Sequence, residues 1–231
     1  MFRMIRALKT LLRGDPAHHA QWLADDGWKR PLGCGAAIIL GCGIYGASVG
    51  WWRAPEQALY TALKFPLLVF LTAGGNALLN GIFAQLLGSG LSFRQTSLAI
   101  LLSFAIAAAF LASITPITLF VLLNTAPLGS AGASMGQSVT LLLHVAVIAY
   151  AGIVANRRLL RLLEQTSGSR AIARRVLFSW LAGNLLLGSQ LAWVLRPFIG
   201  SPEIAVQFLR ADPLRGNFYE AVGHALRHLI F

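Results

Sequence analysis

One uncharged stretch constrains this chain more than any other feature. Between Arg94 and Arg157, 62 consecutive residues contain no lysine, arginine, aspartate or glutamate. A soluble domain carries roughly 25% charged residues, whereas this chain carries 12% and is 56% hydrophobic. A water-facing surface cannot be built from so long an uncharged segment. The sequence therefore predicts an all-α, polytopic integral membrane protein, because its apolar runs have the length of membrane-spanning helices.

The formal net charge of +11, from 19 basic and 8 acidic side chains, does not indicate nucleic acid as a partner. The basic residues cluster at the ends of apolar runs, which favours anionic lipid on the cytoplasmic side. Cys34 and Cys42 are eight residues apart in one apolar run, about 12 Å along a helix, which is beyond disulfide reach. No cofactor is predicted from these residues.

Five apolar runs are long enough to cross a bilayer core of about 30 Å. Residues 1–30 are predicted to be a cytoplasmic basic amphipathic segment, and 196–231 an outward-facing, turn-rich segment that ends in an amphipathic helix. Between them, 31–195 form the transmembrane domain. Its predicted spans are 31–52, 66–87, 97–123, 137–155 and 176–195.

Orientation follows from the lysines and arginines of the short connections. With the N-terminus inside, 13 of them lie on the inner side and six on the outer side. This bias predicts a bacterial inner-membrane protein with a cytoplasmic N-terminus and an outside C-terminus.

Three further segments have a predicted local structure. Residues 1–13 form a basic amphipathic helix, either in the headgroup region or packed on the protein's own cytoplasmic face. Residues 53–64 are predicted to be a short interfacial helix. In the first span, Gly46 and Gly50 have the spacing that permits close approach of another helix.

The polar side chains inside the predicted spans need partners, because lipid cannot hydrogen-bond them. Thr72, Asn76 and Asn80 recur at i, i+4 and i+8 and form one stripe on the second span. The stripe is interpreted first as contact between helices and second as the wall of a solute path. Asn184 and Gln190 on the fifth span are its candidate partners.

His144 lies in the aliphatic fourth span. An interhelical hydrogen bond is the favoured interpretation, and a proton relay or ligation of a metal or tetrapyrrole is the alternative. Ser134 lies in a G-x-S-x-G match at the start of the same span. Rhomboid proteases place a G-x-S-G serine at a helix start, but Met135 replaces the required glycine and His144 follows on the same helix. The chain is therefore predicted not to be an enzyme.

The last helix, 218–231, is too short to span a bilayer. Asn217 and Glu220 have capping-box spacing at its start. Glu220, His224 and His228 recur at i, i+4 and i+8, so they are compatible with a zinc site. An intrahelical pair of Glu220 with His224 is the favoured alternative.

The sequence WVLRPFIGSP (193–202), followed by GNFYE (216–220), resembles a signature of a group of uncharacterised bacterial polytopic membrane proteins. The same group has a K-F-P start to a span (64–66) and an L-S-F-R-Q loop (91–95). The five-span architecture is also loosely similar to that of the Yip (Ypt/Rab-interacting) membrane proteins. Neither resemblance implies an activity.

The corner around 193–202 is open to two interpretations, a structural turn or a docking surface for a partner. For the docking surface, the predicted partner-binding residues are Trp193, Arg196, Pro197, Phe198, Phe218 and Tyr219. The favoured function is a structural or accessory subunit that binds other membrane proteins. The alternative is a small-solute transporter or channel that uses the polar stripe, although its spans lack the carboxylates that ion coupling usually needs.

Overall fold

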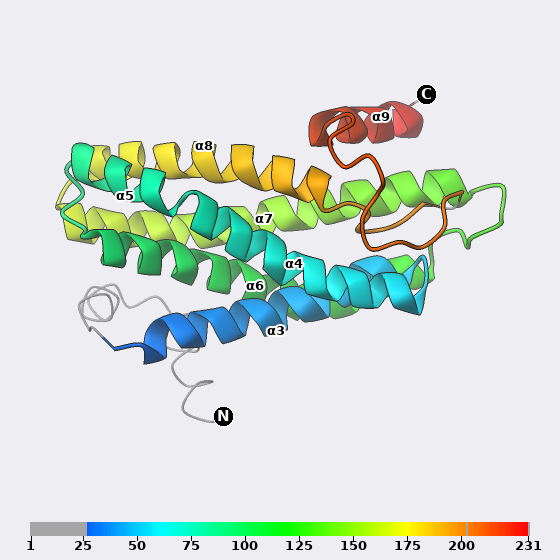
Figure 1. Cartoon of the computed structure of the whole chain (residues 1–231), viewed down its shortest axis with the longest axis horizontal. Helices are drawn as coiled ribbons and strands as arrows, with labels where there is room; N and C mark the ends of the chain where they lie inside the picture. Colours follow the sequence, from blue (N-terminus) through cyan, green and yellow to red (C-terminus); the bar gives the residue numbers. More distant parts are fainter. Residues whose placement is uncertain (1–26, 202, 231) are drawn as a thin grey trace.

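The computed structural model describes residues 27–201 and 203–230 (Figure 1). Within these residues the chain forms seven α-helices and no β-strand, which confirms the all-α prediction. Five of these helices are long and apolar enough to cross a bilayer, as expected of a multi-pass membrane protein. The predicted helix at 1–13 lies outside the described residues. The helices are α3 Lys29–Trp51, α4 Pro55–Gly75, α5 Ala77–Leu86, α6 Phe93–Leu123, α7 Ala133–Ser167, α8 Arg170–Val194 and α9 Phe218–Ile230.

The five long helices lie side by side in one elongated bundle (Figure 1). Around the bundle each packs against the next in the order α3, α4, α8, α7, α6 and back to α3. One apolar cluster joins α3, α4, α6 and α7 around Tyr45 and Phe65. A second joins α5, α6, α7 and α8 around Leu163 and Trp180.

Three glycines of α3 face neighbouring helices at backbone contact distance. A Cβ atom built on Gly46 would lie 2.6 Å from the carbonyl oxygen of Thr61, and one on Gly41 would lie 2.5 Å from that of Ala108. Gly50 meets the backbone of α4 in the same way. The close approach predicted for Gly46 and Gly50 is confirmed, and the neighbouring helix belongs to the same chain.

The second span differs from its predicted form at its start and in its middle. Instead of an interfacial helix at 53–64 and a span from Pro66, one helix runs from Pro55 to Gly75. Proline removes only one backbone donor, so the helix continues through Pro66. One face of the turns before it is covered by the chain that follows α8. The helix then breaks at Asn76, directly after two glycines, which are poor helix formers.

The fourth span is longer than the sequence predicts. Helix α7 has 35 residues, about 52 Å at 1.5 Å per residue, against about 30 Å for the hydrocarbon core. Its last turns, from Arg157 onwards, contain three arginines, Arg157, Arg158 and Arg161. The helix therefore extends beyond the apolar run that predicted it.

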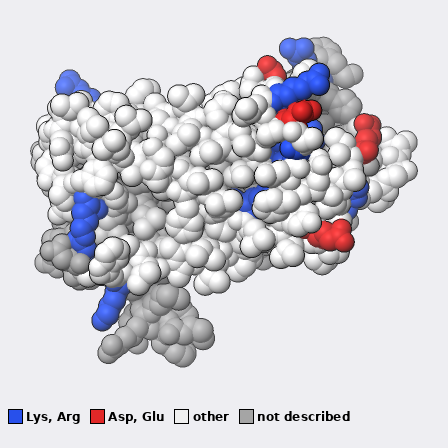
Figure 2. Space-filling view, viewed as in Figure 1, with Lys and Arg blue, Asp and Glu red and all other residues white. Residues whose placement is uncertain are grey.

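Charged side chains gather at the two ends of the bundle (Figure 2). Among the described residues, the end with the α7–α8 hairpin has nine lysines and arginines and one acid, Glu164. The opposite end, with α9, has six basic and four acidic residues. The excess of basic side chains among the described residues thus lies at the α7–α8 end, and the orientation of the chain stays a prediction.

Candidate functional site

The chain that follows α8 is held against the first half of α4 by side chains that donate to its backbone carbonyls. Gln57 Nε2 donates to the carbonyl oxygens of Pro197 (2.9 Å) and Phe198 (3.0 Å). Thr61 Oγ1 donates to that of Phe198 (2.6 Å), and Lys64 Nζ to that of Pro197 (2.9 Å). The three donors share one face of α4 because they recur at i, i+4 and i+7. We call Gln57, Thr61, Lys64 and the two carbonyls the clamp.

Beyond the clamp, two further side chains hold the same segment at the end of the bundle. Arg53, in the α3–α4 turn, donates from Nε to the Ser201 carbonyl (3.0 Å) and from Nη2 to that of Ile204 (3.2 Å). Gln137 of α7 donates to the Gly200 carbonyl at 2.7 Å. Side chains from three parts of the bundle thus hold the backbone of 197–201 and of Ile204.

Lys64 is the most unusual member of the clamp, because its side chain is 0% exposed. Its Nζ lies 4.8 Å from the ring centroid of Phe208 and 5.8 Å from that of Phe198. A buried ammonium needs compensation, since the cost of taking it out of water is several kcal/mol. The Pro197 carbonyl and the two ring faces supply that compensation.

Sequence reasoning missed the clamp residues as a group. The signal was present, because Gln57, Thr61 and Lys64 repeat the helical spacing that identified the Thr72 stripe. Their acceptors, Pro197 and Phe198, belong to the corner that the sequence singled out, but residue types do not show that a backbone carbonyl accepts a hydrogen bond.

Arg196 is occupied by the backbone of the loop that follows. Its guanidinium donates from Nη1 to the carbonyls of Trp193 (2.9 Å) and Pro213 (2.7 Å), and from Nη2 to those of Asp212 and Arg215 (both 2.9 Å). It also stacks on the Trp193 ring at 3.8 Å. Burial and then the nearby charge of Arg210 lower the pKa of Arg196 from its usual value, while Asp212 raises it. The group stays charged and shapes the loop.

The other predicted partner-binding residues separate into inward and outward positions. Pro197 is buried, and the Phe198 ring packs edge to face on that of Phe65 at 5.3 Å. These two residues therefore anchor the segment to the bundle. Tyr219 is exposed, although its hydroxyl lies 3.1 Å from that of Ser189. The Phe218 ring packs against that of Tyr219 at 5.7 Å.

The polar stripe on the second span is buried against α8. Asn76 Nδ2 donates to Asn184 Oδ1 at 3.1 Å, and Asn80 Nδ2 to the same oxygen at 3.5 Å. Trp180 Nε1 donates to the Asn80 carbonyl at 2.8 Å. Thr72 returns its hydroxyl to its own helix. Asn184 is therefore the partner that the sequence proposed.

Gln190, the second candidate partner, lies elsewhere. It lines a groove between α8 and α9 together with residues 217–227. This separation from the stripe follows from spacing, because Asn184 and Gln190 are six residues apart and so point to different faces of one helix.

His144 makes the interhelical hydrogen bond that the sequence favoured. Its Nδ1 lies 2.7 Å from the Tyr45 hydroxyl of α3, and the Tyr45 and His144 rings meet edge to face. Among the described residues none bonds to Nε2. Ser134, ten residues earlier, is exposed at the start of α7. The structure thus does not bring this serine and histidine together.

The start of α9 has the predicted cap. The Glu220 amide donates to Asn217 Oδ1 at 3.0 Å, and Asn217 Nδ2 donates to the Glu220 carboxylate at 2.8 Å. The carboxylate thus faces back toward the cap.

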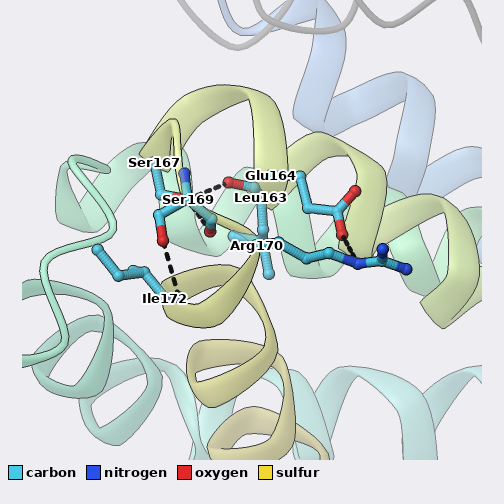
Figure 3. A network of polar contacts seen from close by, with 6 residues as sticks. All are labelled: Leu163, Glu164, Ser167, Ser169, Arg170 and Ile172. Atoms are coloured by element: carbon cyan, nitrogen blue, oxygen red, sulfur yellow. Dashed lines mark hydrogen bonds and ion pairs between the residues drawn. The ribbon is translucent and has the colours of Figure 1, made fainter.

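The opposite end of the bundle is a tight hairpin between α7 and α8 (Figure 3). Gly168 has φ +64°, a left-handed conformation that favours glycine. Ser169 then caps α8 by accepting from the Ile172 amide. Glu164 pairs with Arg170 at 3.1 Å. This exposed ion pair contributes little stability, so the hairpin depends on the glycine and the cap.

With this geometry described, no family model, curated protein or solved structure was found to match the chain. The resemblance carried by residues 193–202 and 216–220 stays a prediction. Function is therefore inferred from the contacts above.

Proposed function

We propose that this protein is a non-catalytic accessory subunit that binds other membrane proteins through the segment 196–231. In this proposal it lies in a bacterial inner membrane, with the N-terminus in the cytoplasm and the recognition segment outside. Anionic lipids cover its basic cytoplasmic end.

The observation that carries the proposal is the way the segment is held. Its backbone carbonyls face inward to the clamp, and several of its apolar side chains face outward. A fixed backbone lowers the ordering cost of binding, and exposed apolar side chains that such a backbone holds in place are candidate contacts for a partner. The exposed apolar side chains are Ile204, Leu209, Leu214 and Tyr219.

Other surfaces are less suited to docking. The glycine face of α3 already packs against α4 and α6 through Gly41, Gly46 and Gly50. Arg196 donates to four carbonyls of its own chain, so it supports the recognition segment from within.

Solute transport is the second candidate, and the break at Asn76 favours it, because discontinuous helices form substrate sites in transporters. Here, however, Asn76 and Asn80 bond to Asn184, and the buried cation Lys64 is used by the clamp. These contacts support helix packing over a solute path.

Purification of the tagged full chain in mild detergent tests the proposal. We expect one membrane protein to co-purify at a reproducible ratio, and deletion of 216–231 to abolish this while the five spans still insert. The substitution Leu214→Ser should weaken co-purification, whereas Leu86→Ser at the other end should not. A lone chain, monomeric or oligomeric, that passes solute in liposomes would refute the accessory role.

A further inference from the structure

The groove between α8 and α9 is lined mainly by α9, inside the recognition segment 196–231, and apolar docking to a partner does not explain its polar composition. It is open to the surface and has a volume of about 580 Å³. The side chains around it are polar or ionisable apart from one glycine. They are Gln190, Asn217, Tyr219, Glu220, His224 and Arg227.

The charges in the groove are balanced and ordered along one helix face. Glu220, His224 and Arg227 recur at i, i+4 and i+7 on α9, so a carboxylate and a guanidinium lie on either side of an imidazole. Along the axis the Glu220 and Arg227 positions are about 10 Å apart. The Glu220 carboxylate also accepts from Asn217 Nδ2 at 2.8 Å, and its remaining lone pairs are left for the occupant. An occupant with one anionic and one cationic group would match this arrangement.

The surroundings place the groove at the level of lipid headgroups. Gln190 is one turn from the end of α8 and Tyr219 lines the groove, while Trp193 at the end of α8 donates to the Arg215 carbonyl just before α9. Tryptophan and tyrosine are enriched at the membrane–water interface. Deeper along α8, Leu185 and Leu186 are exposed and offer an apolar surface for acyl chains.

We propose that the α8–α9 groove binds a zwitterionic phospholipid, with its phosphate on Arg227 and His224 and its ammonium on Glu220. Arginine and phosphate form charge-assisted, bidentate hydrogen bonds. An anionic lipid without an ammonium would leave the Glu220 carboxylate facing a like charge. This site is separate from the basic cytoplasmic end. It lies within the segment 196–231, but lipid retention by the purified chain is measured without a protein partner, so the two proposals can fail separately.

Native mass spectrometry of the purified full chain with defined lipids tests this site. Phosphatidylethanolamine and phosphatidylglycerol with identical acyl chains are the probes, and we expect the first to be retained about tenfold better at this site. Glu220→Gln should remove that preference, and Arg227→Gln should lower retention of both lipids. Glu203→Gln and Arg174→Gln, both exposed and away from the groove, are the matched controls.

Gly223→Leu provides a test that leaves the charges unchanged. A Cβ atom at Gly223 meets nothing within 4 Å, so a larger side chain fits the fold while it fills the groove. We expect this variant to elute as the wild type does and to lose the retained lipid. Soluble phosphoethanolamine should not displace the lipid, because it lacks the acyl chains.

Three results would overturn the proposal. The first is equal retention of the two lipids by the wild-type chain, and the second is unchanged retention in Gly223→Leu. The third is displacement by soluble phosphoethanolamine as effective as by the lipid, which would assign the site to a soluble phosphate compound.

Discussion

The substitution Gly46→Ala tests the packing of α3 against α4, which positions the clamp. A Cβ atom at this position would lie 2.6 Å from the Thr61 carbonyl oxygen, 3.0 Å from its carbonyl carbon and 3.2 Å from the Ala62 Cα. All three neighbours are backbone atoms, so no side chain can rotate away. One of the two helices must move.

The size of the effect follows from that movement. Carbon-to-oxygen contacts of this kind are about 3.3 Å or longer, so the helices must separate by roughly 0.7 Å. Overpacking in a filled interior costs about 1–3 kcal/mol, and a rigid backbone neighbour puts Gly46→Ala in the upper part of that range. For a chain of this length each kcal/mol lowers Tm by about 2–4 °C. We expect a fall of about 5–10 °C.

Gly43→Ala is the matched control on the same helix, because its Cβ would lie at an ordinary 3.6 Å from the Ala62 carbonyl oxygen. Thermal unfolding of the two variants in one detergent, followed by tryptophan fluorescence and size exclusion, measures the difference. Gly43→Ala should unfold within about 2 °C of the wild type, since alanine also favours the helix. Equal Tm values for Gly46→Ala and Gly43→Ala would refute the close packing of α3 on α4.

Three further predictions follow from the contacts at the polar positions. Arg196→Lys removes the planar fork that holds four carbonyls, so trypsin should cleave the following loop several times faster, and an unchanged rate would contradict the role assigned to this guanidinium. Asn184→Leu leaves two buried amides unpaired at a cost of about 1–3 kcal/mol, so its Tm should fall by several degrees, whereas Gln190→Leu should change Tm little. Ser130→Cys and Gln165→Cys lie at opposite ends of the bundle, so an impermeant thiol reagent applied from outside should label only the first; labelling of both from one side would reject the topology.

The spanning helices could be predicted from sequence because their signal is local. An apolar run of about twenty residues is sufficient evidence for each, and the capping pair Asn217 and Glu220 lies within one turn. The stripe of Asn76 and Asn80 was found for the same reason. Because few polar side chains exist inside the spans, its partner was narrowed to Asn184 or Gln190, and the structure selects Asn184.

The clamp could not be predicted because its contacts join distant parts of the chain. Gln57 meets Pro197 across 140 residues, and the acceptor is a backbone carbonyl. The predicted interfacial helix at 53–64 differs from the observed α4 for the same reason. From the sequence alone, Lys64 is interpreted as a charge at the membrane surface. In the structure the segment after α8 covers this lysine and buries it inside the protein.

Site-specific photo-crosslinking in native membranes tests the recognition segment most directly. A crosslinking amino acid at Leu214, which is 81% exposed, probes the segment, and one at Leu86, 77% exposed at the opposite end, is the control. The proposal predicts a discrete adduct with another membrane protein from position 214 and none from position 86. An adduct from position 86 alone, or none from either position, would contradict the recognition role of 196–231.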